Sequence, residues 1–233
     1  MSFDIPAQFE RTPKVYIWPL SNNKLTMLLK DYKNIIFDFG GVILNLDYQR
    51  TINEFKKLGL NDFEERYTQL AQTDLFDMLE RGEASPDEFR AGLREAFTNP
   101  VTDQELDMAW NAMLLDLPSE RLDWLQSIRV GRNISLLSNT NEIHIACFEN
   151  EMKQQHGFED LSGFFDTVYY SSRVGMRKPD VEIFEMVIEK EGYNPSETLF
   201  IDDSPQHIAG AKKAGLNAYH LRANEGETIL DLR

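Results

Sequence analysis

The sequence predicts an α/β fold, a Rossmann-like, doubly wound and mostly parallel sheet with an inserted all-helical domain. From residue 130 onward, short apolar runs alternate with helical patterns, as in a parallel sheet that helices cover on both faces. A first apolar run at residues 35–37 is separated from that region by residues 48–129, whose apolar spacing is helical throughout. Several helices are too many for one crossover between parallel strands, so we interpret this block as an inserted domain.

These patterns divide the chain into three parts. Residues 1–33 form an N-terminal extension that prolines interrupt, and we expect residues 1–26 to lie outside the folded domain. The α/β core comprises residues 34–47 and 130–233, and the helical domain comprises residues 48–129.

Composition limits the possible partners and location. The 233 residues include 24 basic and 39 acidic side chains, a net charge of -15, which argues against nucleic acid and anionic membranes as partners. The single cysteine, Cys147, excludes an intrachain disulfide and a zinc site built from cysteines. No stretch reaches the roughly 20 apolar residues of a membrane span, and no signal peptide is visible. We therefore expect a cytoplasmic protein, as a monomer or a homodimer.

The first strand carries the first candidate site residue. The β-forming residues 35–37 predict a buried strand that ends at Asp38. Gly40 and Gly41 then interrupt the pattern, as a tight turn with close backbone approach requires. A carboxylate at the end of a buried strand, followed by glycines, lies where open α/β sheets bind ligands. The alternative at this point is an aspartate that caps a loop.

The helical domain shows strong helix start signals. Ser85 before Pro86 predicts an N-cap followed by a proline at the first helical position. Thr102 and Glu105 have the spacing of a capping box. Further helices are expected at residues 75–79 and 119–128.

The second part of the core alternates between strands and helices. Strands are predicted at residues 134–137, 165–170, 198–201 and 217–221, and helices at residues 181–191 and 208–214. The second strand leads into Ser138 and Asn139, and the fourth leads into Asp202 and Asp203. Both ends therefore place polar groups at the edge where a parallel sheet binds ligands.

Four candidate positions fall at strand ends or in adjoining loops. They are Asp38, Ser138, Lys178 and the adjacent pair Asp202 and Asp203. Each has an ordinary structural explanation on its own, such as a turn, a solvated lysine or a helix cap. Because all strands of a parallel sheet end at one edge, the set together predicts a site.

These motifs, taken in order, resemble the haloacid dehalogenase-like superfamily of phosphohydrolases over residues 34–221. The four stretches that carry the resemblance are Phe37-Asp38-Phe39-Gly40-Gly41-Val42, Leu137-Ser138-Asn139, Gly175-Met176-Arg177-Lys178-Pro179 and Phe200-Ile201-Asp202-Asp203-Ser204. Residues 137–141 and 175–179 look closest to the branch that contains bacterial α-D-glucose-1-phosphate phosphatase. That branch carries a helical cap between its first and second motifs, where the helical domain is inferred here.

The resemblance implies a Mg²⁺-dependent phosphatase that acts on a small phosphorylated metabolite, with a sugar phosphate as one expected substrate. Asp38 is the expected nucleophile, which takes the phosphoryl group as an aspartyl-phosphate. Ser138, Asn139 and Lys178 are the expected phosphate-binding groups, and Ser138 and Lys178 also assist catalysis. A lysine near the nucleophile fits this chemistry, since it places positive charge where two anions meet.

The resemblance also implies a set of ligands for the metal. Asp38, the backbone carbonyl of Gly40 and Asp203 would bind Mg²⁺, and Asp202 is an additional carboxylate that acts directly or through water. Oxygen ligands of this kind are those that Mg²⁺ prefers. We expect His207 to lie outside the metal ligands.

Gly40 departs from the pattern of many superfamily phosphatases, which have there a second aspartate acting as general acid and base. Such help is typically worth ~10²–10⁴ in rate. Its loss favours leaving groups that need little protonation, such as an anomeric sugar phosphate, or a proton donor from the cap or from water. The glucose-1-phosphate branch also has glycine at this position. Asp47 is a weaker candidate for the acid, and we expect it to be a solvated loop residue.

Two other functions are compatible with the motifs. A haloacid dehalogenase uses the same nucleophile on carbon without a metal, but a metal-free site has little use for the adjacent carboxylates Asp202 and Asp203. A non-catalytic binding or regulatory protein is the second alternative, since a fold does not determine a function.

Overall fold

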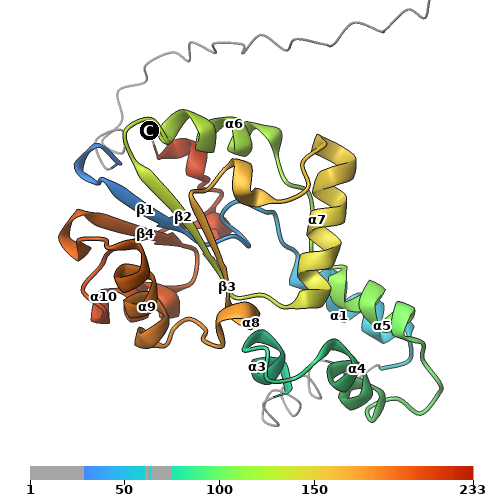
Figure 1. Cartoon of the computed structure of the whole chain (residues 1–233). Coiled ribbons are helices and arrows are strands. Elements are labelled where there is room, and N and C mark those ends of the chain that lie inside the picture. Colours follow the sequence, from blue (N-terminus) through green and yellow to red (C-terminus); the bar gives the residue numbers. More distant parts are fainter. Residues whose placement is uncertain (1–28, 61–62, 64–74, 233) are drawn as a thin grey trace, which may run out of the picture.

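A five-stranded parallel sheet forms the centre of the protein. The computed structural model describes residues 29–60, 63 and 75–232. The strands are β1 (Asn34–Phe37), β2 (Asn133–Ser138), β3 (Thr167–Tyr170), β4 (Thr198–Asp202) and β5 (Asn217–His220). Their order is β3-β2-β1-β4-β5, and all neighbouring strands are parallel (Figure 1). The predicted fold class is confirmed, and β1 lies in the middle of the sheet.

Helices surround this sheet and form the inserted domain. Those of the insertion are α1 (Tyr48–Lys57), α3 (Leu75–Glu80), α4 (Pro86–Arg94) and α5 (Asp103–Asn111). The others are α6 (Ser119–Ile128), α7 (Glu142–His156), α8 (Ser171–Val174), α9 (Val181–Glu191) and α10 (Pro205–Lys213).

The alternation of side chains along β1 explains the two layers of helices. Ile35 and Phe37 belong to a cluster with apolar residues of α6 and α7, whereas Ile36 belongs to a cluster with residues of α9 and α10. Successive side chains of a strand point to opposite faces of a sheet. Every residue of β1 is buried, as expected for the central strand of a sheet covered on both faces.

The inserted helices have a hydrophobic core of their own, and we call them the cap. Phe55, Phe76, Phe89 and Trp110 come from α1, α3, α4 and α5 and pack in one cluster. The predicted capping box of Thr102 and Glu105 is confirmed at the start of α5. The predicted N-cap Ser85 is confirmed at the start of α4, where Glu88 completes a second capping box. In Figure 1 the cap lies beyond the ends of β2 and β3, and α3 lies next to α8.

Two features differ from the sequence interpretation. Helix α6 lies within the predicted cap limits, residues 48–129, but its Leu122 and Leu125 pack in the cluster that contains Phe37 of β1. We therefore propose that the cap ends before α6. Helix α7 was not predicted, although its start carries a signal, since Asn141 caps it by accepting from the backbone N–H groups of residues 143 and 144.

The start of the core can be traced to Leu29. This residue is buried in the sheet cluster, and its carbonyl accepts a hydrogen bond from Arg132. The end of the predicted extension, residues 1–33, thus packs on the core. Residues 1–26, predicted to lie outside the domain, fall outside the described residues. Within the described ranges, none of the helices has the length and apolar character needed to cross a membrane.

Candidate active site

The carboxyl edge of the sheet gathers the predicted catalytic residues. The backbone N–H of Asp38, directly after β1, donates to the carbonyl of Ile201 at 2.9 Å. Ser138 is the last residue of β2, and Asp202 is the last residue of β4. Since β2 and β4 both pair with β1 in parallel, their ends lie on either side of Asp38.

Lys178 lies at the centre of the site and is completely buried. Its Nζ donates to Asp38 Oδ1 at 2.6 Å, to Asp202 Oδ2 at 2.8 Å and to the carbonyl of Leu137 at 2.8 Å. Three acceptors match the three donors of an ammonium group. The lysine therefore occupies one fixed position between two carboxylates from adjacent strands.

The burial of these groups changes their protonation. Burial raises the pKa of Asp38 to about 7, and Asp202 and Asp203 add to this effect, whereas Lys178 opposes it. Burial alone would lower the pKa of Lys178, but the carboxylates of Asp202 and Asp38 outweigh it and raise the pKa. Burial also acts to raise the pKa of Asp202, yet Lys178 and His207 more than offset it and lower the pKa. A further cation beside Asp38 would favour its ionised form.

The donor set at this edge fits a magnesium ion. Asp38, Asp202 and Asp203 each offer one carboxylate oxygen, and these oxygens lie within 4.8 Å of one another. Three ionised carboxylates with a single lysine would leave the cluster two charges short of neutrality, which a divalent cation supplies. The all-oxygen character of the set suits Mg²⁺. Gly40 lies in the turn after Asp38, and its carbonyl as a fourth protein ligand stays a prediction.

The two glycines after Asp38 are explained by close contacts. Gly41 has φ of 76°, and a Cβ there would lie 2.2 Å from Asp203 Oδ2. Only glycine adopts this conformation without strain and also leaves room for the carboxylate. A Cβ at Gly40 would lie 2.6 Å from Leu46 Cδ1, so Leu46 fills the space beside this position.

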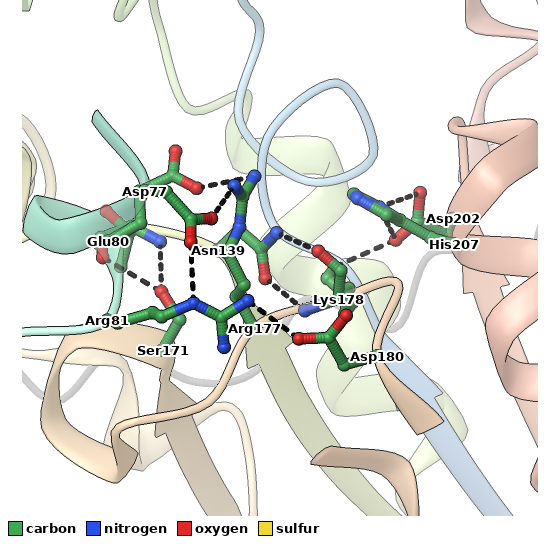
Figure 2. A network of polar contacts seen from close by, with 11 residues as sticks. Asp77, Glu80, Arg81, Asn139, Ser171, Arg177, Lys178, Asp180, Asp202 and His207 are labelled. Carbon is green, nitrogen blue, oxygen red and sulfur yellow. Dashed lines mark hydrogen bonds and ion pairs between the residues drawn. The ribbon is translucent and has the colours of Figure 1, made fainter. Parts of the chain in front are cut away.

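Asn139 lies beside the site and holds the backbone of Lys178. Its Nδ2 donates to the Lys178 carbonyl at 2.8 Å, and its Oδ1 accepts from the Lys178 N–H at 2.9 Å. This pair of bonds joins the loop after β2 to the loop that carries the lysine (Figure 2). Direct contact of Ser138 and Asn139 with phosphate stays a prediction.

Two residues weighed earlier have other partners. His207 Nδ1 lies 3.0 and 2.9 Å from the two oxygens of Asp202, behind the carboxylate cluster. Asp47 caps α1, because its side chain accepts from the N–H of Gln49 at 3.0 Å.

One group of charged residues was missed by sequence reasoning. Asp77, Glu80 and Arg81 from the cap form ion pairs with Arg177 and Asp180 from the loop around Lys178 (Figure 2). Arg177 stood in a recognised motif, but the sequence holds no signal for its partners, because about a hundred positions separate the paired residues.

Comparisons with known proteins agree with this geometry. The profile of the hydrolase family described as haloacid dehalogenase-like matches residues 32–215. The chain is 36% identical over 192 residues to D-ribitol-5-phosphate phosphatase from Bacteroides thetaiotaomicron, an alignment that covers 80% of this chain and 90% of the relative.

Solved structures resemble the protein in fold and in sequence. A HAD family enzyme from Bacteroides thetaiotaomicron, in complex with magnesium and inorganic phosphate, is 38% identical with a TM-score of 0.72, and the match covers 82% of this chain and 95% of that one. A predicted HAD-like hydrolase from Porphyromonas gingivalis is 36% identical with a TM-score of 0.73, with 81% and 90% covered. Magnesium and phosphate are thus bound together by a protein similar to this chain.

Proposed function

We propose, because this chain belongs to the haloacid dehalogenase-like hydrolases, that it hydrolyses the phosphate monoester of a sugar or polyol. The chain is a magnesium-dependent phosphatase that acts on a small phosphorylated molecule. One observation carries the proposed chemistry: Lys178 Nζ lies within 2.8 Å of both Asp38 and Asp202, in a cluster of three carboxylates. The name of the relative from Bacteroides supports D-ribitol 5-phosphate as the first substrate to test.

In the proposed reaction, a carboxylate oxygen of Asp38 attacks phosphorus. The bond from Asp38 to phosphorus forms while the bond from phosphorus to the substrate oxygen breaks, which gives an aspartyl-phosphate and an alcohol. Water then attacks the same phosphorus, releases inorganic phosphate and restores the carboxylate. Lys178 holds Asp38 Oδ1 throughout and places its positive charge beside the phosphoryl group.

Asp38, Asp203 and the carbonyl of Gly40 would hold the magnesium ion, with Asp202 as a further carboxylate. When bound, the metal supplies positive charge that offsets the repulsion between the carboxylate and the phosphate. Asp202 also accepts from Lys178 and lies beside His207, so it fixes the position of the lysine as well.

The leaving oxygen takes its proton from water in this proposal. Gly40 offers no acid, and Leu46 fills the neighbouring space. Asp47 is occupied as the N-cap of α1. Turnover should therefore be fastest for substrates whose leaving group needs little protonation.

A substrate panel tests the proposal. Phosphate release is measured from D-ribitol 5-phosphate, α-D-glucose 1-phosphate and a non-carbohydrate monoester such as phosphoglycolate, each with Mg²⁺ and with EDTA. We expect the highest kcat/KM for the sugar or polyol esters and loss of turnover in EDTA. Preference for the non-carbohydrate ester would refute the substrate class. Fluoride or chloride release from a haloacid in EDTA would favour the dehalogenase.

Glucose 1-phosphate is the second candidate substrate, and Gly40 favours it, because an anomeric leaving group needs little protonation. A cytoplasmic location is a proposal that the single cysteine supports. Assembly as a monomer or homodimer stays a prediction.

A further inference from the structure

The loop that carries Lys178 is bound to the cap by an ion-pair network. We call this network the cap clamp: Asp77 and Glu80 of α3 and Arg81 directly after it, with Arg177 and Asp180 in the core. Figure 2 shows these side chains pointing toward one another next to Lys178 and Asn139.

Asp77 joins the two arginines of the clamp. One of its oxygens accepts from Arg177 Nη1, and the other accepts from Arg81 Nε at 2.8 Å. Arg81 continues to the core, since its Nη2 donates to Asp180 Oδ2 at 2.7 Å. Arg177 Nη2 lies 2.8 Å from Glu80 Oε2 in an additional ion pair. Three of these contacts cross from the cap to the core.

The positions of the core partners connect the clamp to the lysine. Arg177 directly precedes Lys178, and Asp180 follows it by two residues. On the other side, Asn139 holds both backbone groups of Lys178. Asn139 thus holds the backbone of Lys178 from the core. The cap holds Arg177 and Asp180, which lie on either side of the lysine in the sequence.

The surroundings make this contact specific. The clamp side chains are partly buried, with Arg81 and Arg177 exposed by only 23% and 29%. Immediately after Arg81, Gly82 has φ of 69°, and a Cβ there would lie 2.1 Å from the carbonyl oxygen of Ser172. The turn after α3 thus lies directly against α8, and only glycine fits there. The clamp lies at this close contact between cap and core.

We propose that the cap clamp positions Lys178, because its ion pairs to Arg177 and Asp180 hold the loop that sets the lysine ammonium against Asp38. Arg81 and Asp180 are positioning residues in this account, acting through the loop and not on the substrate. The proposal rests on the catalytic role proposed for Asp38 and Lys178.

A double-mutant cycle on the contact between cap and core tests the proposal. Arg81→Gln and Asp180→Asn are each expected to lower kcat about tenfold at saturating Mg²⁺, and the double variant to fall no further, because the two residues form one contact. The inhibition constant of inorganic phosphate is measured as well. Affinity for phosphate is expected to fall together with kcat, since the ammonium of Lys178 faces the phosphate. Arg81→Lys keeps the charge and should recover part of the rate.

Arg90→Gln is the matched control, because Arg90 pairs with Asp107 entirely inside the cap at 2.9 Å and is also partly buried. Its kcat is expected to stay within twofold of the wild type at temperatures well below its Tm. Equal losses in Arg81→Gln and Arg90→Gln would overturn the proposal, since the cause would then be general weakening of the cap. Unchanged kcat in both Arg81→Gln and Asp180→Asn would also overturn it.

Asp38→Asn separates this inference from the proposed function. If Asp38→Asn retains wild-type turnover, the proposed chemistry fails, and the clamp proposal fails with it. If Asp38→Asn is inactive while the clamp variants keep full kcat, only the clamp proposal fails.

Discussion

At the scale of single residues, close contacts fix the position of the catalytic lysine and the kind of residue that fits beside the carboxylates. Lys178 uses its three donors on Asp38, Asp202 and the carbonyl of Leu137, and these contacts hold its ammonium in place. Gly41 is required both by its positive φ and by the nearness of Asp203. These constraints lead to two predictions.

Gly41→Ala is expected to weaken magnesium binding. The new Cβ would lie 2.2 Å from Asp203 Oδ2 and would displace this carboxylate from the cluster. Loss of a partner that only orients a metal ligand typically costs roughly 10–100-fold in metal affinity, so displacing the ligand itself should cost at least that much. A Mg²⁺ titration of activity measures the change. Gly192→Ala is the control, because it has the same kind of strain, with φ of 64°, but nothing within 4 Å of its Cβ. Equal Mg²⁺ requirements for the two variants would contradict the assignment of Asp203.

Gly40→Asp combined with Leu46→Ala is expected to add a general acid. The second change makes room, because Leu46 Cδ1 lies 2.6 Å from where the Cβ would stand. Turnover of an alkyl phosphate should then rise relative to p-nitrophenyl phosphate, by up to ~10²-fold, since only the poor leaving group needs the proton. Leu46→Ala alone should affect both substrates alike. An equal effect of the double variant on both substrates would show that protonation at this position is not limiting.

At the scale of the elements, helix starts could be predicted from local sequence, whereas the packing of a helix on distant residues could not. Capping residues such as Ser85 and Thr102 act within four residues, so the sequence alone located α4 and α5. The placement of α6 depends on which apolar surface it covers, and its helical pattern does not reveal that. The strand predicted at residues 165–170 starts at Thr167 instead, because the backbone N–H of Phe165 donates to the carbonyl of Leu161 in the preceding turn.

The contact between α5 and α7 has a pH dependence of its own. The ring of His144 stacks on Trp110 with centroids 4.8 Å apart, and burial lowers the pKa of His144 to about 4. The unfolded chain has the ordinary pKa near 6.5, so between pH 6.5 and 4 it binds more protons than the folded chain. The stability is therefore full above pH 6.5 and is lost as the pH falls toward 4, by roughly 3 kcal/mol for a shift of this size.

His144→Phe is expected to reduce this loss. Phenylalanine keeps the stack on Trp110, whose carbonyl still accepts from Thr51 Oγ1, and removes the titrating group. The free energy of unfolding in urea is compared at pH 7 and pH 4.5 for both proteins. The wild type should lose roughly 2–3 kcal/mol more than the variant between these values. Parallel losses would mean that His144 does not remain neutral in the folded protein.

At the scale of the whole molecule, sheet topology accounts for the part of the site that could be predicted. Asp38, Ser138 and Asp202 are far apart in sequence, but they lie at or directly after the carboxyl ends of parallel strands and therefore meet at one edge. The clamp could not be predicted in this way. Its ion pairs depend on how the cap is placed on the core, and no repeat or spacing in the sequence records that placement.

The net charge of the molecule repels a phosphate, whereas the local charge of the site attracts it. The chain carries a net charge of -15, which repels an anionic substrate at long range. Binding therefore depends on local positive charge from Lys178 and the metal. High salt should weaken the long-range repulsion while leaving the buried contacts of Lys178 largely intact.

The central claim is that Asp38 receives the phosphoryl group, and mapping of that group tests it most directly. The enzyme is mixed with ³²P-labelled substrate and Mg²⁺, quenched in acid within milliseconds and digested, and the labelled peptide is sequenced. We predict label on the peptide that contains Asp38, none in EDTA and none in Asp38→Asn. Label on any other residue, or Asp38→Asn labelled as strongly as the wild type, would contradict the account.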